Sequence, residues 1–439
     1  MLLFLKKTSK SYYLFNILLA FLPISFIAGN LVINLNMILI IISALLIFGR
    51  DLIKMKFFLL DKLIFTFFLL IIITGIYNDL YFITTNAYPA GYNTIIKSLA
   101  FLRYLLLYIT LRFLIEKELI DLKFFFISCL LCSLFVSFDI FYQLKFGKDI
   151  FGFEMIGTGR RLSGPFGDEL IAGGYLLRFS IFSFFLIPLF YPSVPKNFIK
   201  YFIPFLVITF ITGIILSGNR MPLIMFIFTV FLISIFQKQT RKYFLVFLIT
   251  FTIIFSLIFK FNFEVKNNFF NFYNQVTKMI VLVSEQDFQN EKSPLYLQEF
   301  VTFYDTWLLN KYIGGGIKNF RYYCHVRPNI KKDAKFVCNM HPHNYYLEIL
   351  TETGVVGMMI VLLIFSQIIF LSFYKKYFTN SSLKQNNYII PFIFLFISEI
   401  FPLKSTGSFF TTNNATYLFL IIAILIGLVN RNNLIENKY

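Results

Sequence analysis

The sequence predicts an all-α integral membrane protein, with about 12 transmembrane helices and one large external loop between the ninth and tenth helices. Hydrophobic residues make up 58% of the 439 positions and charged residues 14%, whereas a typical soluble protein has about 25% charged residues. Apolar stretches long enough to cross a bilayer recur along most of the chain. This composition excludes a soluble globular protein, a disordered chain and a coiled coil.

The expected transmembrane segments follow one another with short polar connections, and the first two are close enough to form a hairpin around Gly29 and Asn30. In chain order they are Tyr12–Gly29, Leu31–Phe48, Phe58–Ile76, Ile95–Ile115, Leu122–Gln143, Glu169–Phe190, Tyr201–Leu216, Met221–Phe236, Tyr243–Phe259, Asn344–Tyr374, Tyr388–Leu403 and Ala415–Val429.

The lysines and arginines predict the orientation of these segments. If the N-terminus is cytoplasmic, the cytoplasmic pieces together hold 19 Lys and Arg and the short external pieces 7, the bias that the positive-inside rule requires. Both termini are therefore expected in the cytoplasm. The net charge of +18 reflects this orientation together with a basic external loop, so it does not indicate a nucleic-acid partner.

The polar segment Lys260–Pro342 is expected to form the large external loop. Within it, Phe300, Phe303, Trp307 and their neighbours have the spacing of an amphipathic helix, which we expect the three glycines at 314–316 to end. Such a helix would lie on the membrane surface, with the single tryptophan at the interface. This divides the chain into residues 1–150 (helices 1–5), 151–259 (helices 6–9), 260–342 (the loop) and 343–439 (helices 10–12).

The four cysteines are of two kinds. Cys129 and Cys132 lie in an apolar run and are expected to be packing residues. Cys324 and Cys338 lie in the external loop, where an oxidising compartment would allow a disulfide; two unbonded thiols are the alternative.

The three histidines all lie in the external region, at 325, 341 and 343. Pro342 suits the first position of a helix, which would place His343 in the first turn. The positive end of a helix favours the neutral imidazole, the form that accepts a proton. A polar helix cap is the alternative, and a zinc site lacks further ligands at a convincing spacing.

Arginines in the short external turns are candidates for binding phosphate. Arg220 lies in a tight turn between Gly218 and Pro222, directly before a helix, where a cation is unfavourable unless an anion is nearby. Arg160 and Arg161 form a second external basic site before the sixth segment. Arginine binds phosphate bidentately and keeps its charge at any physiological pH, which suits a diphosphate ligand.

Four ionisable residues lie within the expected spans, namely Arg103, Asp139, Arg178 and Glu399. Such residues are costly in lipid and usually face a bundle interior or a cavity. All four are expected in the outer half of the bilayer or near its centre. They could form structural ion pairs, but their shared depth favours one polar cavity that opens to the outside.

Several of these motifs together resemble the signature of the O-antigen ligase and polymerase family. Residues 341–347 (HPHNYYL), followed by 352–357 (ETGVVG), resemble the family's His-Asn pair, its leucine and its Glu-x-Gly-x-x-Gly pattern. Residues 217–220 (SGNR) resemble its Ser/Thr-Gly-Ser-Arg turn, with asparagine at 219 where serine is usual. Residues 161–166 (RLSGPF) and 314–320 (GGGIKNF) resemble two further elements, although 168–169 (DE) depart from the expected Asn-Pro.

The resemblance implies transfer of a glycan from undecaprenyl diphosphate to a sugar acceptor such as lipid A-core, on the periplasmic face of the bacterial inner membrane. Neither a metal nor another cofactor is implied. His343 would be the catalytic base and Arg220 would stabilise the leaving diphosphate. The further residues expected at the substrates are Arg103, Arg160, Arg161, Arg178, Arg321, His341 and Asn344. Arg321 is the nearest candidate for a loop arginine that family ligases carry near a tryptophan.

Other functions share some of these features. A polymerase that joins lipid-linked repeat units and a protein O-oligosaccharyltransferase would carry the same motifs. A twelve-span flippase or transporter would also have intramembrane charges, but the sequence shows no two matched halves of the kind common in transporters.

Overall fold

The protein is described from a computed structural model over residues 9–85, 93–155, 161–284, 294–326, 338, 343–379, 381–405 and 407–436. Throughout these ranges the chain is helical apart from its connections, and Lys148 and Glu154 form an isolated bridge between extended residues. The all-helical fold class is confirmed. His341, Pro342 and Arg160 lie outside the described residues.

The helices follow the predicted order, with additional ones in the external region. They are α1 (Ser9–Ala28), α2 (Asn30–Ile53), α3 (Leu59–Thr85), α4 (Asn93–Glu116), α5 (Leu122–Phe146), α6 (Ala172–Phe190), α7 (Lys196–Leu216), α8 (Arg220–Phe236), α9 (Lys238–Phe261), α10 (Phe263–Ser284), α11 (Leu295–Trp307), α12 (Phe320–Tyr323), α13 (Tyr345–Ile369), α14 (Lys375–Phe378), α15 (Ile390–Glu399) and α16 (Thr412–Glu436).

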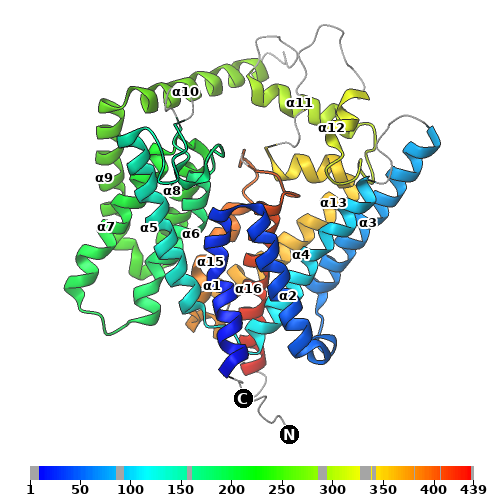
Figure 1. Cartoon of the computed structure of the whole chain (residues 1–439), viewed down its shortest axis with the longest axis horizontal. Coiled ribbons are helices and arrows are strands. Elements are labelled where there is room, and N and C mark those ends of the chain that lie inside the picture. The colour runs from blue at the N-terminus through cyan, green and yellow to red at the C-terminus, as the bar shows by residue number, and fades with distance from the viewer. Residues whose placement is uncertain are drawn as a thin grey trace.

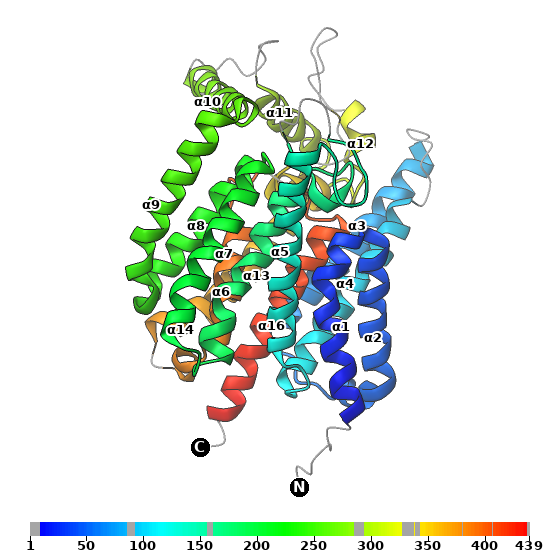
Figure 2. The ribbon, with the colours of Figure 1, turned by 60° about the vertical axis from the view of Figure 1, so that its left-hand side comes forward.

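The long helices run roughly side by side, and α10, α11 and α12 lie together at one end of the bundle (Figure 1). The two chain termini lie at the opposite end, and a second view agrees (Figure 2). The end formed by α10–α12 is called the loop end below.

The central helix α16 and the peripheral helix α9 are both apolar, but they differ in how much of their surface is buried. α16 is apolar on every side from Ala415 to Val429 and is buried along that whole length, packed most extensively on α4. A helix that is hydrophobic all round suits such a central position. α9 is equally apolar but leaves residues such as Leu245, Ile249 and Ile253 exposed. An exposed apolar face of this kind is suited to lipid.

Among the described residues, nine helices are long and apolar enough to cross a membrane, and three expected spans are shorter: Ala172–Ile187, Arg220–Phe236 and Asn387–Glu399. The span predicted over Tyr388–Leu403 is shorter in the structure. The helical stretch there, Asn387–Glu399, includes α15 and ends at Glu399, which forms ion pairs with Arg178 and Lys404. It is shorter than the about 20 residues of a typical transmembrane helix.

The predictions for the first hairpin and for the amphipathic helix of the external segment are confirmed, but the predicted end of that helix is wrong. The hairpin at Gly29 is confirmed, since α1 and α2 pack together and Gly29 has a positive φ of 99°. The amphipathic helix in the external segment is also confirmed as α11. However, α11 already ends at Trp307, so the glycines at 314–316 do not end it. They dock on α13 instead, as described next.

Candidate functional site

His343 lies directly before α13, and Asn344 fixes where that helix begins. The Asn344 Oδ1 accepts hydrogen bonds from the backbone N–H groups of Tyr346 (2.9 Å) and Leu347 (3.2 Å), which is a typical N-cap. α13 therefore starts at Tyr345, and the prediction that His343 occupies the first turn of the helix is wrong, because Asn344 caps the helix after it. The predicted role of Pro342 lies outside the described residues.

Asn344 also ties this end of α13 to the α15–α16 connection. Its Nδ2 donates to the backbone carbonyls of Pro402 (2.7 Å) and Lys404 (3.4 Å). Asn344 was predicted to bind substrate, yet these four bonds use both ends of its amide. The same bonds fix the backbone of the residue that follows His343.

α13 is broken at Gly354, which has a φ of 67° and a ψ of −172°. The loop before α12 fills the break with backbone hydrogen bonds. Gly315 and Gly316 donate N–H groups to the carbonyls of Thr351 (3.0 Å) and Glu352 (2.9 Å), while the carbonyls of Lys311 and Tyr312 accept from Val355 (2.9 Å) and Val356 (3.1 Å). The backbone N–H and C=O groups that the break leaves without partners inside α13 are thus paired with the backbone of the loop.

Glycine is required on both sides of this contact. A Cβ on Gly354 would overlap the carbonyl of Tyr312, and one on Gly314 would overlap the backbone of Glu352 and Thr353. The glycines of the two sequence motifs therefore permit one close backbone contact. This contact fixes the half of α13 that follows His343 against the external loop.

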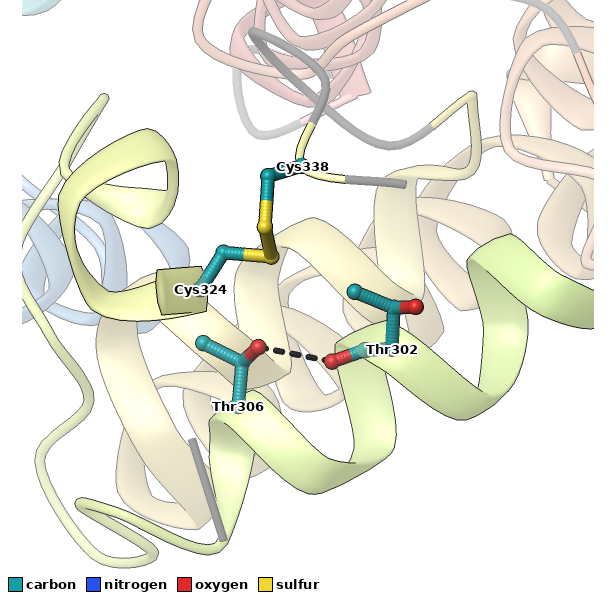
Figure 3. The surroundings of a disulfide bond; sticks show 4 residues. All are labelled: Thr302, Thr306, Cys324 and Cys338. Atoms are coloured by element: carbon teal, nitrogen blue, oxygen red, sulfur yellow. Dashed lines mark hydrogen bonds between the residues drawn. A yellow bond between two sulfur atoms is a disulfide. The ribbon is translucent and has the colours of Figure 1, made fainter. Parts of the chain in front are cut away.

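A disulfide bond in the external region contacts the start of α13. Cys324 and Cys338 are bonded, which settles the alternative left open by the sequence. Cys324 is buried with Phe303 and Phe320, and Cys338 and Leu347 pack on them. Figure 3 shows the bond beside α11, where Thr306 donates to the Thr302 carbonyl (2.6 Å). We call these five residues (Phe303, Phe320, Cys324, Cys338 and Leu347) the disulfide cluster.

Arg220 is the first residue of α8, and α10 covers it. Its Nη1 is 3.4 Å from the backbone carbonyl of Asn268, and its guanidinium lies 4.8 Å from the centre of the Phe272 ring. Asn268 also donates from its side chain to the carbonyl of Gly218 (2.9 Å). α10 was not predicted as a helix, because its polar sequence gives no membrane signal, so this contact was missed.

The turn before Arg220 is fixed to the start of α6. Asn219, which stands where serine is usual in the resembled family, accepts from the Gly173 N–H (3.1 Å) and donates to the Leu170 carbonyl (3.0 Å). The longer asparagine side chain thus spans the gap between the two turns.

Arg161 opens a second turn, which is docked on α5. Gln143 donates to the Ser163 hydroxyl (3.2 Å) and accepts from the Gly164 N–H (2.9 Å). Arg161 is partly buried at this turn.

The intramembrane charges do not form a single group. Arg178 binds Glu399 (2.7 Å), Asn413 (2.7 Å) and Asn414 (2.6 Å), and Glu399 also contacts Lys404 at 2.7 Å. Arg103 instead binds the Ala100 carbonyl (2.6 Å) and the Tyr104 hydroxyl (2.7 Å) on its own helix, and Thr412 more weakly (3.4 Å).

Asp139 is separate again, since it accepts from the Ile150 N–H (2.8 Å). These contacts do not support the expectation of one shared cavity. They also occupy Arg178 and Arg103, which were predicted to bind substrate.

Arg321 lies in a basic group on and near α12. Arg321 and Lys97 both lie near the Tyr322 ring, at 5.6 and 5.5 Å from its centre, and Lys97 also donates to the Lys318 carbonyl (3.3 Å). Burial, followed by the nearby Arg103, lowers the pKa of Lys318. In Figure 1, α12 lies on the right of the molecule, and α8 and α10 lie on the left.

Two carboxylates on α13 are buried, and neither was assigned a role from the sequence, although Glu352 belongs to the Glu-x-Gly-x-x-Gly pattern. Glu348 accepts from the Ser408 hydroxyl and the Phe409 N–H, which fixes α13 to the turn before α16. Glu352 lies one turn further along the helix and is 1% exposed. Within the described ranges, no three residues of the types His, Cys, Asp and Glu gather in a group suited to a metal ion.

Comparison with known protein families finds a match. Residues 205–362 match the family model described as O-antigen ligase, a range that contains Arg220, α10, α11, the disulfide cluster, His343 and the break in α13. No curated protein sequence matches the chain. The match over residues 205–362 thus supports the resemblance to the O-antigen ligase and polymerase family that the sequence motifs indicate.

Proposed function

We propose that the protein transfers a glycan from undecaprenyl diphosphate to an acceptor sugar hydroxyl at the loop end. The observation that carries this proposal is the placement of His343. Its side chain is 45% exposed and lies directly before a helix that is capped by Asn344 and locked at Gly354. A group held firmly yet accessible to solvent is suited to accept a proton from a bound substrate.

The consecutive helices α10 and α11 contact the two residues proposed to act in the reaction, Arg220 and His343. α10 contacts Arg220, and α11 carries Glu299, which faces His343. In the reaction, the acceptor hydroxyl attacks the anomeric carbon of the donor sugar while the bond from that carbon to the diphosphate oxygen breaks. His343 takes the hydroxyl proton, and Arg220, with Arg161 as a second cation, stabilises the leaving diphosphate.

The membrane setting of this proposal is the bacterial inner membrane, with the loop end in the periplasm and both termini in the cytoplasm. The Cys324–Cys338 bond supports this orientation, because disulfides persist in the oxidising periplasm and are rare in the cytoplasm. The exposed apolar faces of helices such as α9 would border the lipid from which the polyprenyl chain enters.

Ligation to lipid A-core is the acceptor reaction we propose. The test is to incubate the purified protein with undecaprenyl-diphosphate-linked glycan and lipid A-core, and to identify the product by mass spectrometry. The expected product is glycan joined to the core, which the matched Arg220→Gln variant should form at least about 100-fold more slowly because it lacks the cation at the leaving group.

A second incubation without lipid A-core separates the alternatives within the family. Lengthened lipid-linked chains in that reaction would identify a polymerase, and a glycosylated protein acceptor would identify a protein transferase. If purified protein forms none of these products from any of the acceptors, the proposed function is wrong.

A further inference from the structure

A carboxylate on α11 faces the proposed base. The Glu299 Oε1 lies 4.0 Å from the His343 Nε2, and their side chains are 7% and 45% exposed. Burying a carboxylate is costly unless charged or polar groups compensate it. Glu299 lies outside the sequence motifs, and 44 positions separate it from His343 in the chain. The two residues are neighbours only in the folded protein.

The geometry of this pair suits an orienting role. At 4.0 Å the atoms are beyond hydrogen-bond distance, but catalytic hydrogen bonds are often long before substrate binds and then shorten. A carboxylate next to one ring nitrogen favours the tautomer with hydrogen on that nitrogen. The other nitrogen, Nδ1, then keeps its lone pair and is the one able to accept a proton.

The disulfide cluster holds the two residues at this separation. Phe303 lies one helical turn after Glu299 on α11, and its ring stacks on that of Phe320 with centres 3.7 Å apart. Leu347, one turn after His343, packs on the same cluster, which the Cys324–Cys338 bond closes. Glu299 and His343 thus come from two helices whose next turns share one small core.

We propose that Glu299 is the positioning residue of His343: it orients the imidazole and stabilises the imidazolium that forms when the acceptor hydroxyl is deprotonated. This inference rests on the proposed function. It assigns Glu299 no contact with either substrate.

The test compares transfer by the wild type, Glu299→Gln and Glu299→Asp. The glutamine variant keeps the size of the side chain and loses its charge, so we expect kcat to fall about tenfold while KM for the donor is unchanged. Glu299→Asp should recover part of kcat, and Glu264→Gln, the same charge change on α10, should behave as the wild type.

A second measurement needs no transfer activity and separates this inference from the proposed function. The rate of carbethoxylation of His343 by diethylpyrocarbonate at a fixed pH, followed by mass spectrometry, reports how reactive the imidazole nitrogens are. We expect this rate to change in Glu299→Gln and to stay at the wild-type value in Glu264→Gln. If the rate is the same in Glu299→Gln and the wild type, Glu299 does not act on His343, whatever the enzyme transfers. If the rate changes but the wild type transfers no glycan, Glu299 orients His343 and the proposed function fails.

Discussion

The charged groups around Arg178 and His343 differ in burial and in what surrounds them. Arg178 lies inside the bundle and contacts Glu399, Asn413, Asn414 and the face of Tyr417, with its side chain 12% exposed. His343 lies outside the bundle, is 45% exposed, and has Glu299 at 4.0 Å.

This difference indicates which charged residues stabilise the fold and which are available to a substrate. Within a membrane, a charge is tolerated when close partners compensate it, and such a network leaves little capacity for a ligand. A catalytic base needs a fixed position but an accessible lone pair. The network around Arg178 therefore fixes α6, α15 and α16 to one another, while His343 is held by its backbone and its helix cap and keeps its imidazole accessible.

The largest expected effect is the loss of Arg178. Arg178→Ala would leave the Glu399 carboxylate buried with Lys404 as its remaining ionic partner, and breaking a buried pair in this way costs about 3–5 kcal/mol. We expect poor yield and a much lower thermal midpoint in detergent, measured by fluorescence-detected size exclusion after heating. The double variant Arg178→Met/Glu399→Met, which removes both charges, should recover much of that midpoint. Equal instability of the double variant would contradict an ion-pair explanation.

The disulfide is expected to have the next largest effect. Cys324→Ser/Cys338→Ser removes a link across 14 residues of sequence, which we expect to cost about 3 kcal/mol in stability of the external region. Hydrogen exchange in the first turn of α13 should become faster, since Leu347 packs on the disulfide cluster. Cys129→Ser/Cys132→Ser, which leaves that cluster intact, provides the comparison; equal exchange at α13 in both double variants would contradict the assigned role.

A smaller cost is expected at the break in α13. Gly354→Ala places a side chain at a φ of 67° and against the Tyr312 carbonyl, with an expected cost of about 1–3 kcal/mol. Gly49→Ala is the matched control, because a Cβ at that helical position meets open space. Thermal unfolding should separate the two variants, and unchanged midpoints in both would show that the backbone contact is not required.

The last prediction concerns the pH dependence of stability, and its effect is small in any one pH unit. Burial lowers the pKa of Lys404 to about 8, although Glu399 lies beside it. Because this value is below that of an unfolded lysine, the folded protein releases the proton first, and Lys404 should add stability as pH rises from about 8 to about 10, by up to 1.4 kcal/mol per pH unit. The difference in thermal midpoint between wild type and Lys404→Met should therefore change across this range. A constant difference would show that Lys404 titrates normally.

The sequence was sufficient where a local rule decides the structure. Apolar length predicted the long helices, Gly29 predicted the first hairpin, and the spacing of Phe300, Phe303 and Trp307 predicted α11. The sequence motifs also identified the turn before Arg220 and the start of α13 to within a few residues.

The sequence-based predictions failed where contacts between residues far apart in the sequence determine the structure. α15 is short because Glu399 is paired with Arg178 on α6, and hydropathy contains no information about that partner. The glycines at 314–316 resemble a helix stop locally, but their role depends on the break at Gly354. Glu299 was not recognised because it meets His343 only through the packing of α11 on the first turns of α13.

The most direct test of the account is His343→Ala, assayed for both transfer and thermal unfolding, with His325→Ala as a control on another external histidine. The account predicts that His343→Ala unfolds at the wild-type temperature but transfers glycan from purified lipid-linked donor at least about 100-fold more slowly, whereas His325→Ala transfers normally. Full transfer by His343→Ala would contradict the assignment of His343 as the base.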